Sequence, residues 1–318
     1  MNTLEMPRLG RPLWIWSLTV AALLYASVGW SAVGRTPGSF AVSPNGESTY
    51  TVPLFAPPGT AKLTPKIALS YGHRAGGSWL GEGWGVSGLS AITRCPKTWA
   101  QDGLSREVKL DLTDRYCLDG AQLKGFVGTY GSTGALYRTE LEQFASIEST
   151  DVAGVTGGPG YFTVKTKDGL IYEYGTREDS RVQAIGTTKV AVWALTTIRD
   201  RAGNQIEFTY DEDTSNGSYQ ISHIDWTSNP WQSLSAAYRM QFFYDTQPAG
   251  EIESGYLMGT GVKDIKRMSR VDVTYNAALV RRYPLVYETN LSWTSRSRLA
   301  SVSECAGASG TDCLLPIT

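Results

Sequence analysis

The sequence predicts an all-β protein, an extended antiparallel meander of hairpins that begins after an N-terminal signal segment. Composition is the first observation: the 318 residues include 34 glycines, 17 tyrosines and 10 tryptophans, and only 19% are charged. Glycine suits tight turns, and aromatic residues favour strands. The second observation is a series of short alternating apolar segments separated by Gly, Asn and Asp turns. The third is that no segment after the signal shows a convincing 3.6-residue apolar period, which would indicate a helix.

The charge balance argues against nucleic acid as a partner. The formal net charge is −1 at pH 7, and no cluster of lysines and arginines is dense enough to bind a phosphate backbone. The length allows one large domain or two ordinary ones, each able to bury a core.

The N-terminal 34 residues have the features of a secretory signal peptide. Arg8 and Arg11 precede an uncharged, largely apolar run that ends in small residues. Cleavage can follow Ser31 or Gly34. An uncleaved membrane anchor is the alternative, because about 20 apolar residues can span a bilayer. We expect a signal peptide over residues 1–34 and an exported chain over residues 35–318. That chain would be secreted, periplasmic or on the outer surface, with membrane contact only through an uncleaved signal.

The exported chain is expected to open with strands separated by turn-rich loops. Tyr50, Val52 and Leu54 alternate, and a Pro-Pro-Gly sequence ends their strand. Further strands are expected over residues 63–71, 89–95 and 137–147, with loops at 125–134 and 152–160.

Residues 69–95 are the densest in glycine and tryptophan and are expected to form a tight corner. Glycine permits left-handed backbone and close approach of other chain segments, and tryptophan supplies wide apolar faces. The residues expected to build this corner are Tyr71, Trp79, Gly81, Gly83, Trp84 and Gly85.

Repeated hairpins that end in tyrosine are expected in the second half. The first spans residues 161–175 about Asp168-Gly169, and the second spans 192–211 about a turn at Gly203. The second ends in Tyr210 and Asp211, and Tyr244-Asp245 ends a later strand at a similar interval. A fourth hairpin joins residues 271–275 with 282–287. Such spacing predicts a meander in which each hairpin buries a face on the next.

The four cysteines favour disulfides, since an even number in an exported chain is typical of them. Short spacing favours the local pairs Cys95–Cys117 and Cys305–Cys313 among the three possible pairings. Free thiols and a zinc site are the alternatives, although the sequence contains no Cys-x-x-Cys and neither histidine lies near a cysteine in the sequence.

The sequence offers weak candidates for chemistry and no cofactor motif, so we expect no catalytic, cofactor-binding or metal-binding residues. Only two histidines exist, His73 and His223, and a Ser-His-Asp site would need one of them. Two acid pairs could share a strand face, Glu140 with Glu142 and Glu251 with Glu253. Two acidic segments are candidates for a calcium site, although neither matches a calcium loop. They are the acidic cluster Asp102, Asp111, Asp114 and Asp119, and the loop 211–217.

Several motifs occur in an order that resembles a known family. They include LGEGWGVSGLSAITRC, DRYCLDG, YRTELEQF, KDGLIYEYG and VWALTTIRDRAGNQIEFTYDED. These look like the N-terminal domain shared by the virulence-plasmid B protein SpvB and the B subunits of insecticidal toxin complexes (TcaC/TcdB-like proteins). The likeness spans about residues 38–313, and the Tyr-Asp hairpins are similar to RHS/YD repeats.

The resemblance implies a β-rich, non-catalytic module of a secreted bacterial virulence or insecticidal toxin. Its role would be to support an RHS shell or to dock toxin-complex subunits, in the same or a neighbouring polypeptide. In the family a propeller or shell and a toxic C-terminal part follow, so we expect this sequence to be truncated before them. The family's ADP-ribosyltransferase would lie in that later part, and the Glu-x-Glu letters of Glu251-Ile-Glu253 do not carry it over.

Two other classes of function remain as alternatives. An extracellular carbohydrate-binding protein could stack sugars on Trp226, Trp231 or Trp293. An enzyme could use the paired glutamates.

Overall fold

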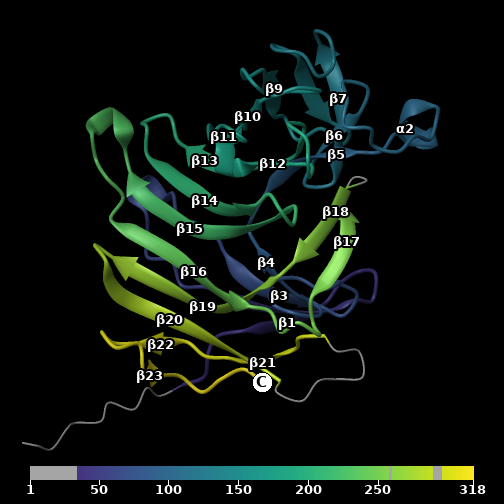
Figure 1. Cartoon of the computed structure of the whole chain (residues 1–318). Coiled ribbons are helices and arrows are strands. Elements are labelled where there is room, and N and C mark those ends of the chain that lie inside the picture. The colour runs from purple at the N-terminus through teal and green to yellow at the C-terminus, as the bar shows by residue number, and fades with distance from the viewer. Residues whose placement is uncertain (1–33, 258–259, 289–295) are drawn as a thin grey trace, which may run out of the picture. The chain divides into compact units, whose positions relative to one another are not determined.

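The computed structural model describes residues 34–257, 260–288 and 296–318 (Figure 1). The expected signal segment, apart from Gly34, and Trp293 lie outside the described residues. The described chain is built of antiparallel strands, which confirms the all-β class. Its helical elements are short: η1 (Thr60–Lys62), α2 (Trp99–Asp102), η2 (Glu178–Ser180) and η3 (Pro230–Gln232). No helix among the described residues is long and apolar enough to cross a membrane.

A four-stranded sheet forms first, with its strands in chain order. The strands are β1 (Ser39–Val42), β2 (Ser48–Pro53), β3 (Ala68–Gly72) and β4 (Trp84–Ser87). Their register places four aromatic residues in one row across the sheet: Phe40 opposite Tyr50, Tyr50 opposite Tyr71, and Tyr71 opposite Trp84. Beside that row, Val52 and Leu69 point into the core. Aromatic and branched side chains on one face of a sheet are the usual basis of its burial.

Eight further strands close into a barrel in which every neighbouring pair is antiparallel. They are β5 (Ala91–Cys95), β6 (Arg115–Leu118), β7 (Ala121–Val127), β8 (Leu136–Thr139), β9 (Ser146–Thr150), β10 (Tyr161–Lys165), β11 (Ile171–Tyr174) and β13 (Val190–Arg199). The barrel is filled by stacked and edge-to-face rings: Tyr116, Tyr130, Tyr137, Phe162 and Trp193. Large aromatics fill a small barrel well because each ring buries much apolar area.

Strand β13 belongs to the barrel and to the sheet beyond it. Its first residues pair with β12 (Arg181–Gln183) and β5, and its last residues pair with β11 and β14 (Gln205–Asp213). From β14 the chain continues as a meander through β15 (Ser218–Ser228), β16 (Tyr238–Thr246), β19 (Lys266–Tyr275) and β20 (Ala278–Tyr287). Three short strands complete it: β21 (Leu299–Val302), β22 (Cys305–Ala306) and β23 (Asp312–Cys313). A separate hairpin, β17 (Glu253–Leu257) with β18 (Thr260–Asp264), lies between β16 and β19 in the chain.

The four-stranded sheet packs on one face of the meander, so the two form a sandwich. In Figure 1, β3 and β4 lie behind β15 and β16. The indole of Trp226 on β15 is fully buried and donates to the carbonyl of Pro57 at 3.0 Å. The backbone N–H of Phe55 donates to the hydroxyl of Tyr283 on β20 at 2.9 Å. Buried residues of the sandwich and the barrel form one continuous hydrophobic cluster.

The structure refines the predicted elements. The hairpins about Asp168-Gly169 and Gly203 are present as β10–β11 and β13–β14. The prediction of a single strand over residues 137–147 is wrong, because β8 ends at Thr139 and β9 begins at Ser146. The loop between them holds two exposed glutamates, which do not fit a continuous barrel strand. The strand expected from residue 63 begins only at Ala68, after Pro65, which cannot donate to a strand ladder.

Candidate functional site

The glycine and tryptophan corner closes one edge of the sandwich. Gly81 and Gly83 have φ of +84° and +76°, and a Cβ at either would lie within 3 Å of a neighbour. That neighbour is the Ser297 carbonyl for Gly81 and the Tyr71 ring for Gly83. Both positions therefore require glycine, as only glycine combines left-handed backbone with so close an approach. Gly85 has no left-handed φ, and a Cβ added there would lie in open space, so this position does not require glycine.

The tryptophans of the corner are structural. Trp79 meets the rings of Tyr219 and Tyr244 edge-on, and its carbonyl accepts from Met268 N at 2.7 Å. Trp84 lies against Tyr71 with 5.5 Å between ring centroids. The corner thus connects the four-stranded sheet to β15, β16 and β19.

A buried arginine organises the inside of the barrel. Arg94 donates to Asp114 at 3.0 Å and to the carbonyls of Val190, Asp111 and Gly157 at 2.7–2.9 Å. Its guanidinium also lies near the rings of Tyr116 and Trp193. Arg94 was not among the residues expected from the sequence. The signal was present, because alternation along β5 places Arg94 on the same face as Ile92, which is fully buried.

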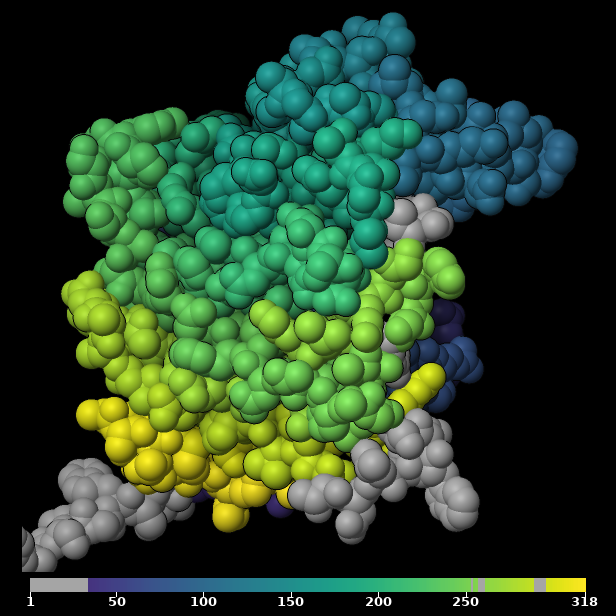
Figure 2. Space-filling model, in the orientation of Figure 1, coloured from purple at the N-terminus to yellow at the C-terminus, as the bar shows by residue number. Residues whose placement is uncertain are grey.

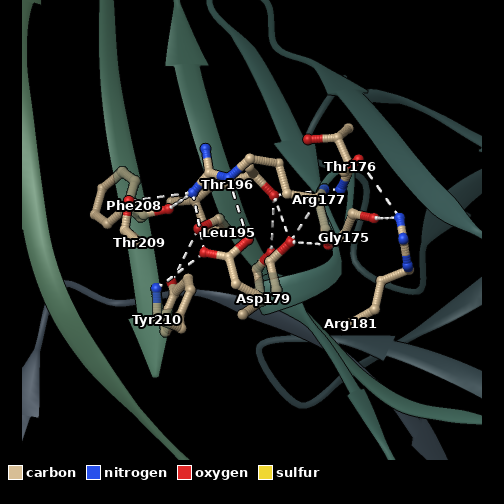
Figure 3. Close-up of polar contacts among 12 residues, drawn as sticks. Gly175, Thr176, Arg177, Asp179, Arg181, Leu195, Thr196, Phe208, Thr209 and Tyr210 are labelled. Carbon is tan, nitrogen blue, oxygen red and sulfur yellow. Dashed lines mark hydrogen bonds and ion pairs between the residues drawn. The ribbon is translucent and has the colours of Figure 1, made fainter. Parts of the chain in front are cut away.

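A second polar network joins the barrel to the meander (Figure 3). Arg177 binds Asp179 through two nitrogens at 3.1 and 3.2 Å, and it also donates to the Phe208 carbonyl on β14. Asp179 accepts from the backbone of Tyr210 at 3.1 Å, and the Tyr210 hydroxyl donates to the Leu195 carbonyl on β13 at 2.9 Å. Burial raises the pKa of Tyr210 well above its ordinary value, so this phenol stays a hydrogen-bond donor.

The other residues of the Tyr-Asp hairpin have different surroundings. Asp211, next to Tyr210, is exposed. Gly203 turns the hairpin with φ +89°, and a Cβ there would lie 2.6 Å from the Trp231 indole. Gly203 and Tyr210 are therefore tied to the fold by contacts that Asp211 lacks.

The four cysteines form two local disulfides, Cys95–Cys117 and Cys305–Cys313. The first joins β5 to β6 at the base of the loop that holds α2, and the second joins β22 to β23. These are the pairs that their short spacing in the sequence favours.

The paired glutamates do not meet as pairs. Glu140 accepts from Gln101, whereas Glu142 binds Arg138 at 3.3 Å and caps the backbone of Phe144. Glu251 is buried, where it pairs with Arg267 at 3.2 Å and accepts from Ser297. The side chain of Glu253 lies outside the described residues. Each described carboxylate is thus engaged by its own partner, with no second acid at hydrogen-bond distance to share a proton.

The acidic segments weighed for calcium are engaged in turns and ion pairs. Asp114 binds Arg94, Asp119 accepts from Ser90 and Ala91, and Asp111 accepts from Thr113. Burial alone would raise the pKa of Asp102, but hydrogen bonds from Arg115 and Gln122 outweigh it and lower that pKa to about 2. In the loop 211–217, Asp213 caps the backbone of Ser215 and Asn216. Across the part of the chain that the structure describes, no three His, Cys, Asp or Glu residues gather as a metal site would require.

Each of the two histidines has its own structural setting. His73 Nδ1 accepts from the backbone of Ser48 at 2.9 Å. His223 is half-buried on β15, 3.8 Å from Asp225, which Arg239 binds through two nitrogens at 2.7 Å. Burial and the nearby Arg239 lower the pKa of His223, so it is neutral at pH 7.

The tryptophans proposed for sugar stacking differ in exposure. Trp226 is fully buried and cannot meet a ligand. Trp231 is 59% exposed, although its indole rests on Gly203 and has Arg199 5.6 Å from its centroid. Trp231 is therefore the one tryptophan of the two described that a sugar could reach.

Known proteins share this architecture. The family model described as Salmonella virulence plasmid 65kDa B protein (SpvB) matches residues 42–254. The N-terminal domain of the effector SpvB from Salmonella typhimurium strain LT2 has a similar structure, with a TM-score of 0.62 and 16% identity. The match covers 80% of this chain and 99% of that domain. No curated protein sequence matches the chain.

Two larger toxin structures contain the same fold. A crystal structure of TcdB2-TccC3 matches with a TM-score of 0.71 and 18% identity, over 91% of this chain and 16% of that chain. The Photorhabdus luminescens Tc holotoxin pore matches with a TM-score of 0.69 and 18% identity, over 86% of this chain and 15% of that one. This chain therefore spans only about a sixth of the length of those toxin chains, and at such identities the likeness shows the fold.

Proposed function

Because this chain belongs to the SpvB family, we propose that it is a non-catalytic structural module of a secreted bacterial toxin. In this proposal the module supports an RHS-type shell or docks toxin-complex subunits that deliver a toxic polypeptide. One observation carries the proposal: nearly all of this chain shares its fold with a small part of a much larger toxin chain. A domain that makes up only a small part of a large toxin chain is consistent with a structural module.

The use of polar residues supports a structural role. The buried and half-buried charges described above, Arg94, Arg177 and Glu251, all bind partners within the fold. A catalytic group must be able to reach the substrate. The hydrogen-bonding atoms of these side chains are instead engaged by backbone groups and ion-pair partners. The proposal assigns the module no chemistry of its own.

Export is part of the proposal. Residues 1–34 would act as the signal peptide, and residues 35–318 would form the exported module. The two disulfides support this route, because disulfides persist in oxidising compartments outside the cytoplasm.

Fractionation of the native producer tests the proposal. Cell, periplasm and medium are probed on denaturing and native gels with an antibody against residues 39–53, and the recognised species is isolated and sequenced by mass spectrometry. We expect the epitope outside the cytoplasm, either in a much larger polypeptide or in a native complex with an RHS-repeat polypeptide. A free species of this chain's own mass, with no RHS-repeat polypeptide attached, would overturn the proposal.

Carbohydrate binding remains the second candidate, and the exposure of Trp231 is the observation that favours it. Sugar rings stack on exposed indoles, so binding should quench tryptophan fluorescence and disappear in Trp231→Ala. Absence of binding across a glycan array would remove this candidate.

A further inference from the structure

The outer surface of the barrel carries a concentration of exposed apolar side chains. Five of them have 51–82% of their surface open, and we call them the barrel patch: Trp99, Phe126, Val127, Leu141 and Phe144. The segment that contains α2 and β7 forms the blue surface at the upper right of Figure 2. Scattered exposed apolar residues need no explanation, but a group on adjoining elements marks a contact surface.

Hydrogen bonds and ion pairs bring the elements of the barrel patch together. Gln101 of α2 binds Glu140 in the loop after β8, and its carbonyl accepts from Lys124 on β7 at 3.4 Å. Asp102 of α2 binds Arg115 at 2.6 Å and Gln122 at 3.0 Å. The disulfide Cys95–Cys117 closes the base of this loop. The patch therefore rests on a braced surface, as a binding surface requires.

Phe144 is held in an exposed position at a conformational cost. Its φ is +56°, in the left-handed region that a bulky side chain rarely adopts, and the residue is 71% exposed. The Glu142 carboxylate fixes this geometry by accepting from Phe144 N at 2.7 Å, and Arg138 holds Glu142 from the other side. Strained residues persist where the surroundings determine them, and they cluster at functional surfaces.

A groove of about 370 Å³ is lined by both Phe126 and Phe144. Its other lining residues are Leu136, Tyr137, Arg138, Glu142, Ala145 and Ser146. The Arg138 guanidinium lies 3.9 Å from the Phe126 centroid, and the Lys167 ammonium lies 5.9 Å from that of Phe144. The groove is thus lined by apolar and aromatic side chains, with the Arg138–Glu142 ion pair among them.

The charge around the patch selects the kind of partner. Residues 96–145 carry six lysines and arginines against seven aspartates and glutamates. An anionic membrane would need an excess of basic residues near the surface, which this segment lacks. An apolar centre with aromatic residues, an arginine and a charge-balanced rim is instead the composition of a protein–protein interface.

We propose that the barrel patch binds an apolar polypeptide segment of a partner protein, with apolar side chains entering the groove between Phe126 and Phe144. This inference deepens the proposed function, on which it rests for the idea that the module holds another polypeptide. It names the surface and the chemistry of the bound segment: extended or looped, aliphatic or aromatic, and without a strong charge of either sign.

Peptide selection on the immobilised protein tests the inference. A phage library of random 12-residue peptides is selected on the wild-type protein, and the affinity of each enriched peptide is measured by fluorescence anisotropy. The test variant is Phe126→Ser/Phe144→Ser, and the matched control is Phe40→Ser, which alters another exposed phenylalanine on β1, outside the barrel. We expect enriched peptides rich in apolar residues, bound at least tenfold more weakly by the double variant and equally well by the control.

Several outcomes would overturn the inference. They are no enrichment, equal binding by the double variant, binding to phosphatidylglycerol vesicles that needs Phe126 and Phe144, or a wild-type dimer that the double variant abolishes. Thermal melts check folding, and if the double variant melts early, Leu141→Ser replaces it with the same expectation. Peptide binding at the patch without an RHS-repeat partner in the producer would preserve the inference and overturn the proposed function. Absence of peptide binding at the patch, together with an RHS-repeat partner in the producer, would overturn the inference and preserve the proposed function.

Discussion

The carboxylate of Asp114 lies 3.0 Å from the guanidinium of Arg94, and both side chains are closed to solvent, with 0% and 1% exposed. Three backbone carbonyls complete the shell of the arginine, so every nitrogen of its guanidinium is hydrogen-bonded. A buried charge is tolerated only in such surroundings.

Asp114→Asn is expected to lower the free energy of unfolding by about 3–5 kcal/mol, because it leaves the Arg94 charge buried without a counter-charge. Urea denaturation at pH 7 measures the effect. The control is Glu288→Gln, which breaks an ion pair with Arg298 in which both side chains are about half exposed. That loss should stay below about 1 kcal/mol, as for exposed pairs in general. Equal losses in the two variants would contradict this account of the barrel interior.

Asp102 is expected to make stability depend on acid pH. Its pKa in the fold is about 2, below its ordinary value, so the folded state favours the ionised form. The resulting stabilisation is present above about pH 4 and is lost as the pH falls from about 4 to about 2. Its size is about 1–2 kcal/mol, since the side chain is only 3% exposed while its partner Arg115 is partly open to water.

Urea denaturation from pH 2 to pH 7 tests this dependence by comparing wild type with Asp102→Asn. The variant should be less stable at pH 7 by that amount, and the difference should shrink toward pH 2. A difference that is constant across the range would show that the carboxylate is not the source.

Gly81 and Gly85 are expected to respond oppositely to alanine. Gly81→Ala places a Cβ against the Ser297 carbonyl in left-handed backbone, so we expect a loss of about 2–4 kcal/mol. Gly85→Ala adds a methyl group into open space on β4, and alanine suits a strand better than glycine by about 0.5 kcal/mol. Differential scanning calorimetry distinguishes the two variants. A destabilised Gly85→Ala would mean that the corner restricts both positions.

Tyr210 and Asp211 are expected to differ although they form one sequence motif. Tyr210→Phe removes the donor to the buried Leu195 carbonyl and should cost about 1–2 kcal/mol. Asp211→Asn alters an exposed side chain and should change stability by less than about 0.5 kcal/mol. Chemical denaturation of both variants checks the contrast, which would fail if Asp211→Asn were the more destabilised.

The sequence predicted features that local patterns encode. The turns at Asp168-Gly169 and Gly203 follow from the left-handed backbone that glycine allows, and the residues on both sides alternate as strands must. The corner glycines Gly81 and Gly83 carry the same signal. These elements depend on neighbours within about ten to twenty residues, which a single sequence displays.

Pairing between strands that are distant in the chain could not be predicted from the sequence. The barrel closes where Ile92 on β5 pairs with Trp193 on β13, and no local pattern records that the two strands meet. The barrel patch was missed for a related reason: Trp99, Phe126 and Phe144 come together only once β7 and β8 pair and α2 lies beside them. From sequence alone, apolar residues are assigned to the hydrophobic core, and only the fold shows which of them face water.

The shared strand β13 also limits how this molecule can be divided. Val192–Ala194 pair with β5 to close the barrel, whereas Thr197–Arg199 pair with β11 of the barrel on one side and with β14 of the meander on the other. If the chain is cut before β13, the N-terminal fragment lacks one strand of the barrel. If it is cut after β13, the C-terminal fragment lacks the strand edge on which β14 pairs. We therefore expect the barrel and the sandwich to unfold in a single transition, and neither half to fold when it is expressed alone.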